Sequence, residues 1–311
     1  MNCSLDIVIV NWNSGERLRA CLASIIKADQ SNYLLNRVTI VDNASEDASA
    51  VGLRDLDLPL NIITNNTNRG FAAACNQGAS GSRSDYLLFL NPDTELFLDS
   101  LIEPLRFMEM PENAGVGICG VKLLDEIGDP TTSCARFPTP GILFGKITGL
   151  AKFSPYFKEH LMAADEYMQS GFVDQVIGAF FLVRRKLYSE LNGFDERFFV
   201  YFEEVDFSLR AKNAGYSSYL LAESSAQHTG GVCSDQAGSN RLFYNLRSRI
   251  YFGLKHYSIA ANILLILLTL TIEPFSRSFW AIRQRSLPSI RDTFAAYGKL
   301  ITYFMVKRKW A

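Results

Sequence analysis

The sequence contains few of the features that build disulfide frameworks, zinc sites or membrane spans. Its six cysteines are scattered, and no two are spaced as C-x-x-C. That pattern predicts reduced, buried thiols in a cytoplasmic protein rather than a disulfide framework or a zinc site. We expect no signal peptide, because the strand-like segment LDIVIVNWN begins almost at the first residue. The uncharged apolar segment 259–272 is shorter than the roughly 18–20 residues that a membrane span needs.

Net charge is also nearly absent, but it is unevenly distributed. Residues 236–311 carry 12 Lys/Arg against 2 Asp/Glu, and residues 1–235 carry 19 against 30, so balances of +10 and −11 give the net charge of −1. This asymmetry predicts two domains with different partners, 1–238 and 239–311. The basic, apolar second region suits helices that lie in an anionic membrane interface. A helical cap with solvated charges explains it as well.

The first 125 residues alternate strand and helix signals. Strands are predicted at 6–10, 38–42, 60–64 and 86–90, and helices from about residue 16, over 70–81 and over 98–110. This alternation predicts an α/β fold with a mostly parallel sheet and helices on both faces. Further on we expect loops and short helices over 136–174, strands at 178–184 and 217–221, and a helix over 203–213, followed by a helical tail.

Four of the predicted strands end in unusually polar segments. Ligands bind beyond the carboxyl ends of strands in an open parallel sheet, so these segments are candidates for a nucleotide site: Asn11, Trp12, Asn13, Asp42, Asn68, Arg69, Gly70, Asn91 and Asp93. Each one alone is ordinary turn chemistry. Together they could hold a nucleotide, with Trp12 against the base and Asp42 on a base N–H or ribose hydroxyl. Asp93 could bind a divalent cation, because Mg²⁺ uses one or two carboxylates together with phosphate oxygens.

A cluster of three acids follows an aromatic segment at 198–202. Glu203, Glu204 and Asp206 lie within four residues of one another, and an acidic first turn of a helix explains them without function. Aromatic neighbours and mutual repulsion would instead raise a carboxyl pKa towards that of a general base. His228, before two glycines, is a candidate ligand or a structural hydrogen-bonding residue. The segment GVGICG at 115–120 matches a dinucleotide fingerprint only by chance, because a helix precedes it and the segment itself is strand-like.

The order of these motifs resembles a known family. The segments VIVNWNS, VDNASED, NRGFAAACNQG, FLNPDTEL, GAFFLVRR and GFDERFFVYFEEVDFSLRAKNAGY resemble, over about residues 5–232, the inverting family 2 glycosyltransferases of the GT-A fold. Within that family they are most similar to rhamnosyltransferase-type enzymes of bacterial surface polysaccharide (O-antigen) synthesis.

The resemblance implies roles for the matching residues. Asn11, Trp12 and Asp42 would line the nucleotide site. Asn91-x-Asp93 stands where the family has a metal-binding D-x-D, which leaves Asp93 as the acidic ligand of Mg²⁺ or Mn²⁺, and His228 matches a histidine that completes the metal site in several relatives. Glu204 stands where the family has an aspartate base, and its neighbours Glu203 and Asp206 are rival candidates.

The expected activity is therefore sugar transfer with inversion from a nucleotide-diphosphate donor. The resemblance points to dTDP-rhamnose and a saccharide or lipid-linked saccharide acceptor. The basic, apolar tail suggests a location at the inner face of the plasma membrane, and we expect no nucleic-acid partner. Another donor such as a UDP-hexose is an alternative, and a sugar nucleotidyltransferase is a more distant one. A non-catalytic binding protein and a NAD(P)-dependent oxidoreductase are the remaining rivals.

Overall fold

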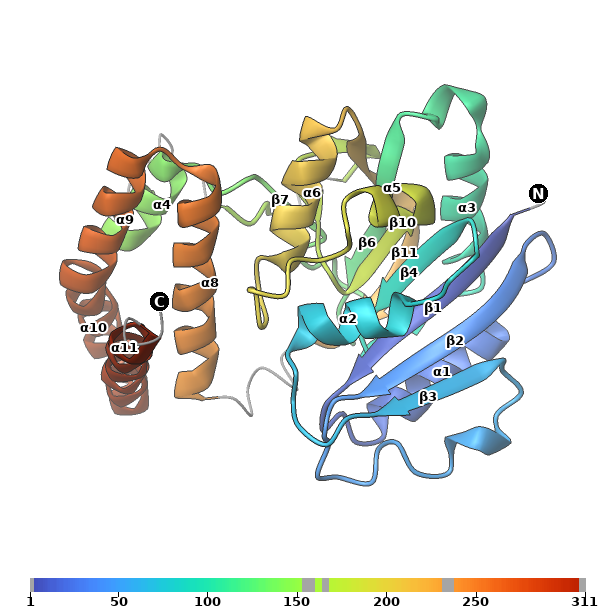
Figure 1. Ribbon diagram of the computed structural model, residues 1–311, viewed down its shortest axis with the longest axis horizontal. Helices are drawn as coiled ribbons and strands as arrows, with labels where there is room; N and C mark the ends of the chain where they lie inside the picture. The colour runs from blue at the N-terminus through green and yellow to red at the C-terminus, as the bar shows by residue number, and fades with distance from the viewer. Residues whose placement is uncertain (1–2, 153–159, 164–167, 231–237, 308–311) are drawn as a thin grey trace. The chain divides into compact units, whose positions relative to one another are not determined.

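The computed structural model describes residues 3–152, 160–163, 168–230 and 238–307 (Figure 1). The chain forms two compact units: unit 1 is Met1–Phe137, Leu161–Phe199 and Glu203–Cys233, and unit 2 is Pro138–His160, Val200–Phe202 and Ser234–Ala311. Two earlier segments of the chain thus pack with the C-terminal helices. The division into domains at residue 238 stays a prediction.

Unit 1 is built on a nine-stranded sheet with the order β3-β2-β1-β4-β10-β6-β11-β5, in which β8 also pairs with β11. The strands β3, β2, β1, β4, β6 and β11 run in one direction, and β10, β5 and β8 run against them. The expected mostly parallel sheet is confirmed. The bounds are β1 (Ser4–Asn11), β2 (Leu34–Asp42), β3 (Leu60–Thr64), β4 (Tyr86–Leu90), β5 (Thr94–Leu96), β6 (Val116–Leu124), β8 (Gly171–Val173), β10 (Phe180–Arg184) and β11 (Ser217–His228); a separate pair joins β7 (Cys134–Ala135) to β9 (Gln175–Val176).

Helices cover both faces of this sheet, as expected. Successive side chains of a strand point to opposite faces, so Ile7 and Ile9 of β1 pack with α1 (Arg17–Lys27) and α3 (Ile102–Glu109). Val8 and Val10 belong to the other face, which is covered by the helices α2 (Phe71–Ala79), α5 (Arg185–Glu190) and α6 (Glu203–Asn213). Burial on both faces explains the apolar strands.

Two strands differ from the prediction. β11 continues to His228 rather than ending at residue 221, because after a register shift between Leu221 and Ser225 it pairs with β6 again and also with β5. The polar residues at the shift make this half of the strand resemble a loop. β5 was not predicted at all, since only three residues separate it from β4.

The glycines of GVGICG lie on or beside strand β6, so the dinucleotide fingerprint is a chance match as expected. A Cβ atom on Gly117 would lie 2.4 Å from Leu187 Cδ2, and one on Gly120 would lie 2.7 Å from Val176 Cβ. These glycines serve close packing against neighbouring side chains.

Unit 2 is helical in its described residues: α4 (Pro140–Thr148), α8 (Ser239–His256), α9 (Ile259–Thr271), α10 (Glu273–Arg283) and α11 (Leu287–Lys307). The core of α8 and α11 includes Leu246 and Leu300. A buried charge network accompanies it, because the carboxylate of Glu273 accepts hydrogen bonds from Arg249 and Arg277. These two arginines lower the pKa of Glu273 to about 2 despite its burial.

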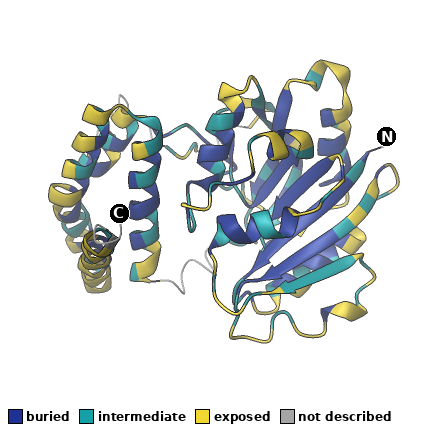
Figure 2. Ribbon diagram, in the orientation of Figure 1, coloured by how far each residue is buried: buried dark blue, intermediate teal, exposed yellow. Residues whose placement is uncertain are grey.

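Large apolar side chains remain exposed on α9, α10 and α11, where Figure 2 shows much of the surface as exposed while the sheet strands are mostly buried. Within the described residues, no single helix is long and apolar enough to cross a membrane. α9 and α10 meet these criteria of length and composition only as a pair, which is bent by 42°.

Candidate active site

The ends of β1 and β2 place two predicted nucleotide-binding residues side by side. Asn11 and Asp42 are partners in the parallel ladder, and Asn11 Nδ2 donates a hydrogen bond of 2.9 Å to Asp42 Oδ1. Ser45 Oγ donates to the same oxygen at 2.5 Å. Both side chains are buried, so Asn11 fixes the orientation of Asp42, whose Oδ2 receives no hydrogen bond from the described residues.

Asn13 holds the loop after β1 against the loop after β2. Its backbone adopts a left-handed conformation with φ 51°, and its Oδ1 accepts hydrogen bonds from the backbone N–H groups of Glu46 and Asp47 at 2.7 and 3.3 Å. This side chain is therefore engaged in shaping the site. Trp12, the neighbouring residue, is half-buried.

Asn43 organises the loop before α2, a role that was not predicted for it. Its Nδ2 donates to Asn68 Oδ1 at 3.0 Å and to the Gly70 carbonyl at 3.2 Å, and its Oδ1 accepts from the Arg69 backbone N–H at 3.0 Å. Asn68 thus uses its side-chain oxygen within the loop, whereas the Arg69 side chain is exposed. The position of Asn43 directly after Asp42 is the sequence signal that could have identified this role.

The turn after β4 brings Asp93 to His228, which is far away in sequence. Thr94 pairs with His228 in the β5–β11 ladder, and the Thr229 N–H donates to the Asp93 carbonyl at 3.2 Å. As a result Asp93 Oδ1 and His228 Nε2 lie 3.4 Å apart, with side chains 8% and 18% exposed. Asn91 adjoins them, and its backbone N–H donates to the Ala179 carbonyl at 3.0 Å.

Asp93 and His228 form a pair rather than a complete metal cage. Among the described residues, no group of three or more His, Cys, Asp or Glu side chains could hold a metal ion. A carboxylate and an imidazole nevertheless fit a divalent cation whose remaining ligands come from phosphate oxygens and water. Such a site would depend on the nucleotide for its coordination.

Glu203 and Glu204 begin α6 in a dry environment. Glu203 is 4% exposed, and the Oε2 atoms of both residues are buried without a hydrogen-bond partner among the described residues. Burial, followed by repulsion from Glu204, raises the pKa of Glu203 well above its usual value, and burial also raises the pKa of Glu204. Carboxyl groups with raised pKa values suit general base catalysis near neutral pH.

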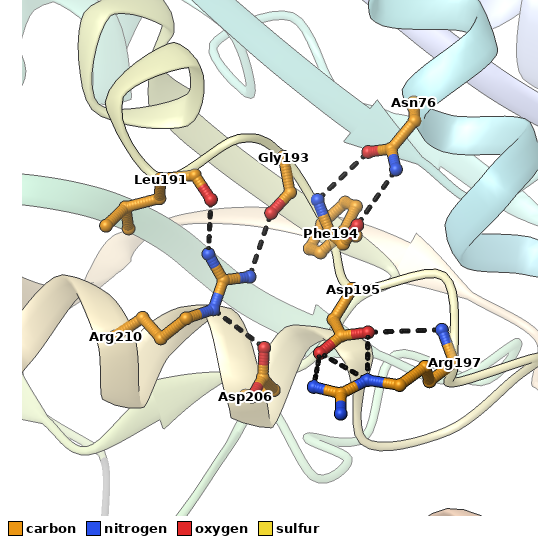
Figure 3. Close-up of polar contacts among 8 residues, drawn as sticks. All are labelled: Asn76, Leu191, Gly193, Phe194, Asp195, Arg197, Asp206 and Arg210. Atoms are coloured by element: carbon orange, nitrogen blue, oxygen red, sulfur yellow. Dashed lines mark hydrogen bonds and ion pairs between the residues drawn. The ribbon is translucent and has the colours of Figure 1, made fainter. Parts of the chain in front are cut away.

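Asp206, the third predicted acid, is engaged in a structural ion pair. It is fully buried, and Arg210 Nε donates to its Oδ2 at 2.7 Å. The same guanidinium donates to the carbonyls of Leu191 and Gly193 at 2.7 and 2.8 Å (Figure 3). A catalytic role of Asp206 stays a prediction, but its carboxylate already orients Arg210.

Residues 178–179 lie close to both the turn that carries Asp93 and the candidate base. Ala179 accepts the hydrogen bond from the Asn91 N–H, and a Cβ atom on the preceding Gly178 would lie 4.0 Å from Glu204 Cγ. Gly178 is thus covered by Glu204 on one side. The structure brings together strand ends that carry amides and a carboxylate, an Asp–His pair, and a buried glutamate.

Sequence comparisons agree with this arrangement. The family description "Glycosyl transferase family 2" matches residues 6–148. The chain is 26% identical over 242 residues to the N-acetylglucosaminyl-diphospho-decaprenol L-rhamnosyltransferase of Mycobacterium tuberculosis, covering 72% of this chain and 75% of that protein. It is 28% identical over 146 residues to the rhamnosyltransferase WbbL of Escherichia coli, covering 46% of this chain and 52% of that protein. The chain carries a glycosyl transferase family 2 domain over residues 6–148.

Solved structures agree with this assignment at the level of the fold. The mannosyltransferase PcManGT of Pyrobaculum calidifontis, solved in complex with GDP-Man and Mn²⁺, aligns with a TM-score of 0.56 at 15% identity, covering 100% of this chain and 83% of that chain. The GT-A expectation is thereby confirmed. The family match and the named relatives show that the protein is a glycosyltransferase. The family match includes Asp42 and Asp93, whereas Glu204 and His228 lie beyond it.

The burial of Glu203 predicts that this acid destabilises the fold at neutral pH. Because its folded-state pKa is raised, stability is highest below its usual pKa of about 4.5 and falls as pH rises towards the folded-state pKa. Glutamine stays neutral, so Glu203→Gln should raise the free energy of unfolding at pH 8 by about 1 kcal/mol or more, since one pKa unit corresponds to ~1.4 kcal/mol. The gain should shrink at pH 4.

Urea denaturation at the two pH values measures this effect. Glu112→Gln, which changes an exposed glutamate, is the matched control and should change stability little at either pH. A loss of stability in Glu203→Gln that is larger at pH 8 than at pH 4 would contradict the prediction.

Proposed function

We propose that the protein transfers rhamnose with inversion from dTDP-rhamnose to a saccharide or lipid-linked saccharide in bacterial cell-surface polysaccharide synthesis. The observation that carries the proposal is the pairing of Asp93 with His228 on the same edge of the sheet as Asn11 and Asp42, with Glu204 of α6 close to Gly178. The rhamnosyl donor is supported by the names of two relatives. A different donor such as a UDP-hexose is the alternative.

In this proposal the nucleotide lies at the carboxyl ends of β1, β2 and β4. The Oδ2 atom of Asp42 accepts a hydrogen bond from the base or ribose, and Trp12 contacts the base. Asp93 and His228 hold a divalent cation, Mg²⁺ or Mn²⁺, that would neutralise the diphosphate and stabilise it as a leaving group. The Mn²⁺ named with two structural neighbours supports this choice.

Glu204 acts as the general base in the same proposal. Its carboxylate takes the proton of the acceptor hydroxyl while that oxygen attacks the anomeric carbon, and the bond from this carbon to the diphosphate oxygen breaks on the opposite side. The reaction yields an inverted glycoside and a nucleoside diphosphate. Glu203, which is more deeply buried, positions Glu204 or the acceptor.

The donor and the metal can be tested together in a thermal-shift panel, because a ligand that binds only the folded protein raises its Tm. dTDP-rhamnose and dTDP should raise the Tm more than UDP-sugars or GDP-mannose, and only with Mg²⁺ or Mn²⁺ present. Asp93→Ala should abolish the metal dependence, and His228→Ala should weaken it. A preference for a UDP-sugar would reject the rhamnosyl donor alone, and shifts unchanged by EDTA would reject the metal role.

The base can be tested with Glu204→Gln, which keeps the shape of the side chain but cannot take the proton. Transfer should fall by roughly 100-fold to 10,000-fold, the usual contribution of general base catalysis. Donor affinity, measured by calorimetry, should stay within about threefold, since a missing base leaves nucleotide contacts intact. Near wild-type transfer in Glu204→Gln, combined with inactivity of Glu203→Gln or Asp206→Asn, would assign the base to another acid.

The rival activities give different products. A sugar nucleotidyltransferase would release pyrophosphate from a nucleoside triphosphate and a sugar phosphate, whereas sugar transfer releases a nucleoside diphosphate. A non-catalytic binding protein would bind a nucleotide sugar without converting it to products. Product analysis by chromatography separates all three.

We also propose that the enzyme works at the cytoplasmic face of an anionic membrane, bound through an apolar face of unit 2. This face consists of exposed side chains at helical spacing: Ile259, Ile263, Leu267 and Leu270 on α9, Ile272, Phe275, Phe279 and Ile282 on or beside α10, and Leu287, Phe294, Ile301 and Met305 on α11. Exposed Arg283, Arg285 and Arg291 lie among them in sequence. Apolar and basic side chains together favour an anionic lipid interface. The scattered cysteines, without a C-x-x-C pair, suit the cytoplasm.

Vesicle binding tests this surface with the full chain. Vesicles of phosphatidylcholine with phosphatidylglycerol should bind the protein, and binding should fall as salt rises. The double change Phe275→Ser and Phe279→Ser should weaken binding at least about tenfold, because each buried phenylalanine contributes roughly 1.5–3 kcal/mol. Phe172→Ser, which changes an exposed phenylalanine of unit 1, is the matched control. Equal binding to neutral and anionic vesicles, or to neither, would contradict the proposal.

A further inference from the structure

We propose that Asn76 is a positioning residue for the transfer reaction, which ties α2, the helix that follows the proposed donor loop, to the chain segment that leads to Glu204. This inference rests on the proposed function, because it takes Glu204 as the base. Asn76 lies on α2, whose first turn follows the loop 68–70. Its side chain points towards Phe194 (Figure 3).

The amide of Asn76 uses its full hydrogen-bonding capacity on this contact. Its Oδ1 accepts from the Phe194 N–H at 2.9 Å and from the Tyr188 hydroxyl at 2.5 Å, and its Nδ2 donates to the Phe194 carbonyl at 2.8 Å and to Glu196 Oε1 at 3.0 Å. A primary amide offers two acceptor and two donor positions. The Asn76 amide thus pairs with both the backbone N–H and the carbonyl of Phe194, as a neighbouring strand would.

The local backbone is adapted to this approach. Gly193 has φ +69°, and a Cβ atom at this position would lie 2.5 Å from Asn76 Oδ1. A side chain there would push the amide away, so glycine is required for the contact as well as for the left-handed conformation.

Arg210 holds the same segment from α6. Its two terminal nitrogens donate to the carbonyls of Leu191 and Gly193, while Asp206 orients the guanidinium. Asn76 and Arg210 therefore hold the peptide group between Gly193 and Phe194 from two different helices, as Figure 3 shows. Residues 191–196 cannot shift relative to α2 or α6 without breaking several of these hydrogen bonds.

The segment returns to α2 a few residues later. The Phe71 N–H, at the first residue of α2, donates to the Phe199 carbonyl at 2.5 Å, and a Cβ atom on Gly70 would lie 2.5 Å from the same oxygen. Gly70 itself is held by Asn43 and Asn68 in the predicted donor loop. From Phe199 the chain reaches Glu203 after four residues and Glu204 after five, so the last contact of this segment with α2 lies close in sequence to the candidate base.

This arrangement gives Asn76 control over the distance between donor and base. A misplacement of about 1 Å at a reacting group can reduce the rate by about 100-fold. Loss of the amide should therefore slow the chemical step while the donor contacts of β1, β2 and β4 persist. A purely structural residue would lower stability and leave that step unchanged.

Steady-state kinetics and calorimetry on the full chain separate these outcomes. Asn76→Ala should lower kcat by about 100-fold while the Kd of the nucleoside diphosphate stays within about threefold. Asn36→Ala is the matched control: it removes amide hydrogen bonds to Asp6 and Ser84 near the amino end of β2, and it should leave kcat within twofold. A kcat of Asn76→Ala equal to that of the control would overturn the proposal.

Tyr188→Phe provides a milder test if Asn76→Ala does not fold. It removes one hydrogen bond to Asn76 Oδ1 and should lower kcat several-fold with unchanged nucleotide affinity; an unchanged kcat would overturn the proposal. Glu204→Gln distinguishes a failure of the proposed base from a failure of the positioning role of Asn76. Active Glu204→Gln would reject the base and with it this positioning role, whereas inactive Glu204→Gln with fully active Asn76→Ala and Tyr188→Phe would reject the positioning role alone.

Discussion

The antiparallel pairing of β5 with β11 is the interaction on which the rest of the site depends. β5 has only three residues, and it exists because the turn at 91–93 reverses the chain directly after β4. The register of the pair sets Thr94 opposite His228, which places an imidazole against Asp93. β11 reaches that far only because its register shift lets it continue beyond residue 221. One long strand thereby joins the sheet core to the metal-ligand candidates.

The acids at the start of α6 show how the fold accommodates an unfavourable arrangement. Two adjacent carboxyl groups are buried there, and their repulsion and desolvation favour protonation of at least one. The positive end of the helix dipole partly offsets this cost. Two residues with left-handed backbone, Tyr201 and Phe202, precede them. Such strain commonly persists at functional sites because the surrounding structure fixes it.

Unit 2 combines a well-ordered interior with an unusually apolar exterior. The Arg249–Glu273 ion pair is almost completely buried, and such a pair is retained only with good hydrogen bonding, because desolvation of both charges is costly. Large apolar side chains are exposed on α9, α10 and α11, and α10 also carries Glu273 of this ion pair. These exposed side chains are the basis of the membrane contact proposed for unit 2.

Local sequence patterns determined most of the secondary structure of this protein. Period-two and period-3.6 spacing of apolar residues depends only on near neighbours, so β1, β3, β4 and α6 were predicted closely, and the polar strand ends were found at once. The sequence also indicated the family through the order of its motifs. The i,i+4 spacing of Asp206 and Arg210 on α6 is a local signal for their ion pair, whereas Glu203 and Glu204 could be ranked only by resemblance.

Tertiary structure alone decided which of these residues meet. The Asp93–His228 pair depends on the register of β5 and β11, whose paired residues lie 130 to 134 positions apart in the chain. The contacts of Arg210 with the carbonyls of Leu191 and Gly193 depend on where that segment folds back against α6. Asn43 and Asn76 are ordinary polar residues in the sequence and become organising ones only through their partners. Contacts of this kind are set by the packing of distant segments, which leaves no periodic trace in the sequence itself.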